Sequence, residues 1–289
     1  MVLRALSHFF LPRYQDENFL CYNDILALSP CHLNCIPTTH HIPDWRYLLL
    51  APERSLDLLR KMWEICSRAV EEQFWANTKW RNFNLRGAQD GSLTWEAFKG
   101  CFCTGMNYPP SQYQLHLQFI VPPLMPFDFH KLENGEHFHH NRFFPFEYVE
   151  AVLSFCIKEG ERLTFPFSGG PTEAGIEEII AFFDAKGISY EKIHGDFVTR
   201  AKASQRKLAK WEKAQFEAVA KVDTASGAET IVRLHPNGEE DGDAVGGSPL
   251  PEGTDSGKVR AEDKKILMNC IATTYYQHAK APGEVAVWP

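Results

Sequence analysis

The strongest indication of fold lies in one segment, Asn107-Tyr-Pro-Pro-Ser111-Gln-Tyr-Gln114-Leu-His116-Leu-Gln118-Phe-Ile-Val-Pro122. From Gln114 onward polar and apolar residues alternate, which is the period of a β-strand. A strand over 111–121 would place Gln114, His116 and Gln118 on one face and the intervening apolar residues on the other. One imidazole then lies between two amides on a sheet whose second face is hydrophobic core. This arrangement predicts a histidine that acts on a phosphate group.

His116 has the chemistry of a nucleophile. A neutral imidazole can attack an α-phosphorus and form a phosphoramidate, which divides one difficult displacement into two easier ones. Its other ring nitrogen must be held by an acceptor, so that the attacking nitrogen carries the lone pair. The amide NH2 groups of Gln114 and Gln118 can donate to the phosphoryl oxygens without adding a charge. The alternative is a hydrogen-bonded core histidine with no catalytic role.

Upstream of this segment the sequence predicts a strand, a helix and a hairpin. Arg46-Tyr-Leu-Leu-Leu-Ala51 is a continuous apolar run that a proline ends, as is typical of a strand buried on both faces. A helix is expected over 55–74, because a serine can cap it and apolar residues recur at helical spacing. Residues 98–106 indicate a second strand. The turn chemistry of Asn107-Tyr-Pro-Pro110 then predicts a β-hairpin that leads into the motif.

Together these elements resemble the histidine-triad (HIT) superfamily in order and spacing. That family has an apolar strand ending in a proline and a basic residue, a helix, a hairpin, and the signature His-φ-His-φ-His-φ-φ, in which φ is apolar. Here the signature is Gln114-φ-His116-φ-Gln118-φ-φ, and the resemblance covers roughly residues 15–125. His116 matches the family's nucleophile. The glutamine in the last position is similar to the transferase branch, which includes galactose-1-phosphate uridylyltransferase and the diadenosine tetraphosphate phosphorylases.

The resemblance implies further site residues. Ser111 lies where the family places a serine near the leaving-group oxygen. Asn107 resembles the asparagine that precedes the signature. Independently of the resemblance, the positive charges of Arg142 and Lys131 in the polar segment after the motif make them candidates for phosphate contacts.

The chain departs from the family pattern in three places. The first triad histidine is Gln114, the glycine-rich turn before the signature is Tyr108-Pro-Pro110, and a histidine often found at the start of the apolar strand is Tyr47. No residue matches the acidic group that holds the ribose of the nucleotide. The alternative function is therefore a nucleotide-binding or scaffold protein that keeps the fold and has lost the chemistry.

Two histidine-rich segments contain residue types that bind metals. Glu136-His137-Phe-His139-His140 would place two histidines on one face of a strand, which leaves a metal-dependent hydrolase as a third alternative. Cys31-His32-x-x-Cys35, followed by His40-His41, has zinc-ligand residues, but not at the spacing of a zinc pair. A polar loop and buried thiols explain both segments, so we expect no metal and no cofactor.

Composition limits the remaining classes. An apolar fraction of 44% and 21 phenylalanines predict a folded globular protein, and a net charge of -7 gives no general attraction to nucleic acid or anionic membranes. No apolar run reaches the roughly 20 residues of a membrane helix, and the N-terminus lacks the pattern of a signal peptide. The eight cysteines have irregular spacings that indicate reduced, buried thiols. We therefore expect a cytoplasmic protein.

These observations predict an α+β protein. A HIT-like antiparallel sheet forms a nucleotide-binding domain over 1–145. A C-terminal α/β extension follows over 146–289, with a strand over 189–194 and a flexible acidic Gly- and Pro-rich loop near 236–257. The expected function is nucleotidyl hydrolysis or transfer on dinucleoside polyphosphates or related conjugates, through a covalent intermediate on His116. The partner is then a nucleotide or dinucleotide, with neither nucleic acid nor membrane; a homodimer is expected only because family members often pair.

Overall fold

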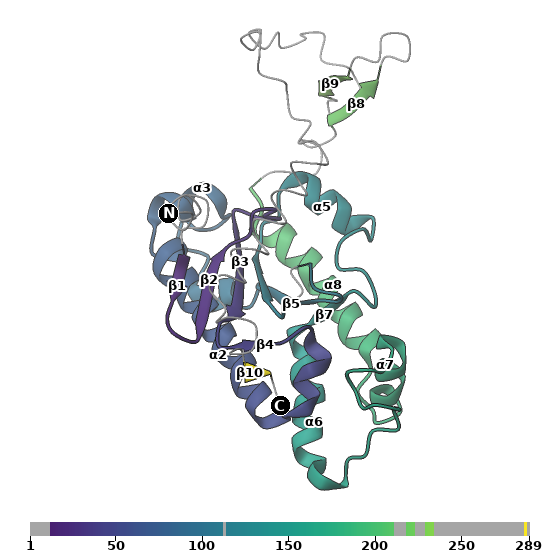
Figure 1. Cartoon of the computed structure of the whole chain (residues 1–289). Coiled ribbons are helices and arrows are strands. Elements are labelled where there is room, and N and C mark those ends of the chain that lie inside the picture. Colours follow the sequence, from purple (N-terminus) through teal and green to yellow (C-terminus); the bar gives the residue numbers. More distant parts are fainter. Residues whose placement is uncertain (1–11, 112–113, 211–217, 223–228, 234–285, 288–289) are drawn as a thin grey trace, which may run out of the picture.

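A six-stranded antiparallel sheet forms the centre of the protein, in the order β1-β2-β3-β6-β5-β7 (Figure 1). The computed structural model describes residues 12–111, 114–210, 218–222, 229–233 and 286–287. The strands of this sheet are β1 Pro12–Gln15, β2 Phe19–Asn23, β3 Cys31–Pro37, β5 Cys103–Asn107, β6 Leu117–Val121 and β7 Phe143–Pro145. The α+β class with an antiparallel sheet is therefore confirmed.

Helices cover both faces of this sheet (Figure 1). Their bounds are η1 Trp45–Leu50, α2 Pro52–Val70, η2 Glu71–Trp75, α3 Thr78–Asn84, α4 Trp95–Lys99, α5 Pro126–Glu133, α6 Phe146–Glu159, η3 Gly160–Arg162, α7 Ile176–Asp184 and α8 Tyr190–Leu208. Helices α2 and α6 pack on the face that presents Leu33, Leu117 and Phe119. Helices α5 and α8 pack on the opposite face, against Cys103 and Ile120.

The alternation predicted for the motif is confirmed. The alternate apolar residues from Leu115 to Val121 belong to the main core, whereas Ile120 belongs to the smaller cluster on the other face. Strand β6 is shorter than expected, because its pairing with β3 begins at Leu117, opposite Cys35. The residues just before it bond instead to the 37–42 segment.

The strand predicted over 46–51 is wrong, because this segment is the 3-10 helix η1. Asp44 accepts a hydrogen bond from the backbone N–H of Arg46 at 2.9 Å and forms an ion pair with its guanidinium at 2.8 Å. This cap turns the chain into a helical conformation. Helix α2 follows at once, with Pro52 in its first turn. The buried strand of this part of the chain is instead β3, Cys31–Pro37, which is buried throughout.

Two further expectations are corrected in part or in full. The predicted hairpin is present, since β5 and β6 pair antiparallel, but α4 occupies the start of the expected 98–106 strand. The strand expected over 189–194 is wrong, because α8 begins there. The Ser189 hydroxyl accepts from the N–H of Lys192 at 3.4 Å, which caps that helix.

One hydrophobic core joins the parts of the chain before and after residue 145. It contains Leu33 and Leu59 together with Val152, Phe183 and Leu208. The loop expected near 236–257 lies outside the described residues.

Three features complete the fold. The seven cysteines in the described ranges are all free and buried, as expected. No helix among the described residues has the length and apolar character to cross a membrane. Beyond the main sheet, β10 (Ala286–Val287) pairs parallel with β4 (His40–His41), and β8 (Ala218–Val222) pairs with β9 (Glu229–Arg233).

Candidate functional site

His116 lies immediately before β6 and is 1% exposed. Its Nδ1 lies 3.0 Å from the carbonyl oxygen of Gln114. A carbonyl only accepts, so in the neutral ring Nδ1 carries the proton and Nε2 carries the lone pair. Burial lowers the pKa of His116, and the bond to the Gln114 carbonyl and the charge of Asp24 oppose that effect. The side chain is therefore a neutral imidazole whose nucleophilic nitrogen is Nε2.

Gln114 is fully buried, and its side chain forms hydrogen bonds with the main chain of residues 37–42. Its Nε2 donates to the carbonyl oxygens of Pro37 at 3.2 Å and His40 at 3.1 Å, and its Oε1 accepts from the N–H of Ile42 at 3.0 Å. Both amide protons are thus used by the main chain, in contrast to the sequence expectation of a phosphate donor. Gln114 is a positioning residue, because its own carbonyl orients the ring of His116.

Since the side-chain amide of Gln114 is bonded to the main chain, Gln118 is the motif glutamine that we assign as a donor to a phosphate. It lies in the middle of β6, between Asn34 of β3 and Gly105 of β5. Strand alternation places its side chain on the same face as His116. Gln118 is 9% exposed, which is more open than either Gln114 or His116.

Asp24 and His32 are functional candidates that the sequence analysis missed. Burial lowers the pKa of His32 to about 4, while the charge of Asp24 raises it and that of His116 lowers it. The carboxylate of Asp24 lies 3.8 Å from Nε2 of His32, and its charge also raises the pKa of His116. Asp24 Oδ2 also accepts from Nδ2 of Asn34 at 2.7 Å. The available signal was the alternation His32-Leu33-Asn34-Cys35, which repeats the polar–apolar pattern of the motif.

The other predicted site residues lie in three places. Ser111 is exposed after β5, on the connection to β6. Asn107 pairs with Phe143 of β7, and the backbone N–H of Tyr108 donates to the carbonyl oxygen of Arg142 at 2.7 Å. Asn107 and Arg142 therefore lie close together where β5 pairs with β7. Lys131 lies on α5, where its Nζ is 4.5 Å from the centroid of the Phe127 ring.

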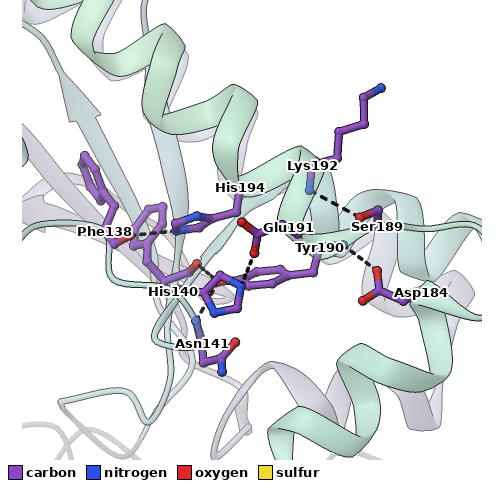
Figure 2. Close-up of polar contacts among 10 residues, drawn as sticks. Phe138, His140, Asn141, Asp184, Ser189, Tyr190, Glu191, Lys192 and His194 are labelled. Atoms are coloured by element: carbon purple, nitrogen blue, oxygen red, sulfur yellow. Dashed lines mark hydrogen bonds and ion pairs between the residues drawn. The ribbon is translucent and has the colours of Figure 1, made fainter. Parts of the chain in front are cut away.

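The histidine-rich segment after α5 is fixed to α8 (Figure 2). Tyr190 Oη donates to the carbonyl of Phe143 at 2.8 Å and accepts from the N–H of Asn141 at 3.1 Å. His194 Nε2 lies 2.7 Å from the carbonyl oxygen of Phe138. These bonds hold a loop in which Phe138 and Asn141 adopt left-handed backbone angles, with φ of 55° and 62°.

The same segment does not gather metal ligands. His137 Nε2 lies 3.1 Å from Asp128 Oδ1, and His140 Nε2 lies 2.8 Å from Glu191 Oε2. Each histidine thus pairs with a different carboxylate. Within the part of the chain that the structure describes, no three His, Cys, Asp or Glu side chains are arranged to hold a metal ion. The metal-dependent alternative has no ligand set there.

We expect Tyr190→Phe to lower the free energy of unfolding by about 2 kcal/mol, because it removes the hydrogen bonds to a buried carbonyl and to a partly buried N–H. Tyr190 is 0% exposed, so the ring itself keeps its packing. Urea denaturation measures the loss. Tyr14→Phe is the matched control, since its hydroxyl bonds to Asp16 at an exposed position and its loss should stay within about 0.5 kcal/mol. Equal losses in the two variants would contradict this account.

The fold and the site have the features of a HIT-like domain, an antiparallel sheet that carries a buried neutral histidine in its motif. Residues 10–132 match the family model described as "Scavenger mRNA decapping enzyme C-term binding", and this range contains His116 and the strands β1 to β6. The match and the antiparallel sheet support the assignment of residues 10–132 to the HIT-like superfamily, as the sequence resemblance predicted. They support a nucleotide-related activity in general. No curated protein and no solved structure matches the chain significantly.

Proposed function

We propose that the protein is a nucleotidyl hydrolase or transferase with His116 as its covalent nucleophile. The observation that carries this proposal is the 3.0 Å contact between His116 Nδ1 and the Gln114 carbonyl. It fixes the tautomer whose Nε2 can attack phosphorus. The substrate class is a dinucleoside polyphosphate or a related conjugate. The match to a decapping-enzyme domain supports the inclusion of cap-like dinucleotides in that class.

The proposed reaction has two steps. Nε2 of His116 attacks the α-phosphorus, a P–N bond forms, and the P–O bond to the leaving group breaks. Water, or another acceptor in a transferase, then attacks the same phosphorus and breaks the P–N bond. Gln118 donates to the phosphoryl oxygens, where charge builds in both steps. Ser111 is assigned to the leaving-group oxygen.

The remaining contacts hold the nucleotide. Asp24 is assigned to the ribose hydroxyls, because its carboxylate bonds to Asn34, which lies opposite Gln118 in the sheet. It supplies the acidic contact for which the family resemblance offered no residue. Asn107 is kept as a nucleotide contact because of the family resemblance, and Arg142 and Lys131 because of their positive charge.

Turnover in ¹⁸O-labelled water tests this function. Dinucleoside triphosphates and tetraphosphates, cap-like dinucleotides and nucleotide sugars are the substrates. A hydrolase should release a nucleoside monophosphate with one ¹⁸O on its α-phosphorus, whereas a transferase should need an added acceptor such as inorganic phosphate. Label on the other product would contradict attack at the α-phosphorus.

A second candidate is a nucleotide-binding protein without turnover. The burial of His116, at 1% exposed, favours it, because a nucleophile must meet its substrate. This candidate expects nucleotides to raise the melting temperature while every substrate of the panel stays intact.

The pH dependence of kcat/KM follows from a neutral nucleophile. Burial is the largest cause that lowers the pKa of His116 from the ordinary value of 6.5. The neutral ring is the reactive form, so activity should persist as the pH falls below 6.5 and decline only near the lowered pKa. A profile from about pH 4.5 to 8 measures this limb. An acid limb centred at or above the ordinary histidine pKa would contradict a buried neutral nucleophile.

A further inference from the structure

His32 presents a buried hydrogen-bond donor that lacks a partner. Its Nδ1 accepts from the backbone N–H of Leu28 at 3.2 Å, so the proton of the neutral ring lies on Nε2. Nε2 has no hydrogen-bond partner among the described residues, and His32 is 4% exposed. The carboxylate of Asp24 lies 3.8 Å away, which is too far for a hydrogen bond. Burial lowers the pKa of His32 to about 4, so the ring is neutral at physiological pH.

Two residues further along β3, Asn34 presents a buried acceptor. Its Nδ2 donates to Asp24 Oδ2 at 2.7 Å, and since a carboxylate only accepts, this bond fixes which way the amide points. Oδ1 of Asn34 has no partner within the described ranges, and the residue is 2% exposed. Side chains two apart on a strand share a face. A donor and an acceptor, each fixed in orientation, thus lie on one face without partners.

The sheet register sets their distance from the nucleophile. Asn34 lies opposite Gln118, and His32 lies opposite Ile120. At the rise of a β-strand, they are roughly 7 and roughly 13 Å from His116 along β6. A nucleotide with its α-phosphorus at His116 and its ribose at Asp24 extends in this direction. Its base then reaches the pair.

We propose that His32 Nε2–H and Asn34 Oδ1 form a base-reading pair that binds a nucleobase edge with an acceptor beside a donor. Guanine offers O6 and N1–H, and adenine offers N1 and its exocyclic amine. The inference rests on the proposed function, because it uses His116 to place the phosphorus. A base without such groups is bound poorly, since it leaves the buried polar atoms unpaired.

Access to the pair requires the tip of the turn that follows β2, residues 25–27, to move outward. This turn bonds to both side chains, through Leu28 to His32 and through Asp24 to Asn34. Its tip is solvated, with Ile25 41% and Leu26 73% exposed. Movement of the tip alone keeps the bonds that fix both side chains, and the tip takes no part in the β3–β6 pairing.

The test compares bases in the wild type and in Asn34→Leu. The probes are dinucleoside triphosphates whose bases are guanine, adenine or unsubstituted purine. The wild type should prefer guanine or adenine over purine by about 10²-fold in kcat/KM, because only the first two satisfy the pair. Asn34→Leu should reduce this preference to about threefold or less. Asn23→Leu is the matched control, since Asn23 is exposed at the end of β2, and it should keep the preference.

A binding measurement separates this inference from the proposed chemistry. Dissociation constants for the same three probes, by calorimetry, require no turnover. The base preference in these constants, and its loss in Asn34→Leu, supports the pair even if no substrate reacts. Equal affinity for the three bases in the wild type, or an unchanged preference in Asn34→Leu, would overturn it. Asn34→Ala replaces Asn34→Leu if the melting temperature shows that the leucine variant does not fold.

Discussion

His116→Ala is expected to lower kcat/KM at least about 10³-fold on every nucleotide that the wild type turns over, because the covalent route is lost. His116 is 1% exposed, so the alanine variant also leaves a gap in the protein. His116→Gln is therefore measured beside it, since glutamine fills more of the space and cannot attack phosphorus. Turnover by high-performance liquid chromatography and melting temperature are recorded for both.

The control is His130→Ala, which removes an exposed histidine of α5. It should keep full turnover. If the loss of turnover in the two His116 variants is proportional to their loss of melting temperature, this histidine has a structural role. Full turnover by either His116 variant would remove it from the chemistry.

Gln114→Leu is expected to lower the free energy of unfolding by about 3 kcal/mol, because three backbone groups, two of them in buried residues, lose a hydrogen bond. These groups are the carbonyls of Pro37 and His40 and the N–H of Ile42, at distances of 3.2, 3.1 and 3.0 Å. Leucine is close to glutamine in size, so the loss reports the hydrogen bonds. Urea denaturation measures it.

Gln118→Leu is the matched variant on the other side of His116. It should change the free energy of unfolding by less than about 1 kcal/mol, while turnover falls about 10²-fold because a donor to the phosphoryl oxygens is gone. The opposite result, with a stable Gln114→Leu and an unfolded Gln118→Leu, would reverse the roles assigned to the two amides.

Local periodicity was sufficient to predict the elements that have a clear period. The residues from Leu115 to Val121 alternate in the sequence and alternate between the two cores of the protein. The helix expected over 55–74 corresponds to α2 and its π-helical end, and its apolar stripe packs on the sheet. In these segments the burial of one face fixes the conformation, so the period of the apolar residues predicts the secondary structure.

The secondary structure of residues 46–51 could not be predicted from periodicity, because a continuous apolar run has no period that distinguishes a strand from a helix. The conformation of this segment is fixed by Asp44, which caps the 3-10 helix by accepting a hydrogen bond from the backbone N–H of Arg46. Likewise, the start of α8 has β-branched and aromatic residues that favour a strand. The Ser189 cap stabilises the helix instead.

The site was predictable only where its residues are close in sequence. His116 and Gln118 follow from the motif itself. The role of Gln114 depends on partners more than 70 residues away, at Pro37, His40 and Ile42. The pairing of β3 with β6 places His32 and Asn34 on the face that carries His116, and Asp24 joins them through its bond to Asn34; composition and spacing do not reveal this register.

Intact-protein mass spectrometry after brief mixing with dinucleoside polyphosphates tests the central claim most directly. The claim is that Nε2 of His116 forms a bond to the α-phosphorus. The wild type should gain the mass of one nucleoside monophosphate less water. This adduct should be labile in acid, as phosphoramidates are, and absent from His116→Ala and His116→Gln. Turnover without any adduct on the wild type, or an adduct that persists in both His116 variants, would contradict a covalent intermediate on this histidine.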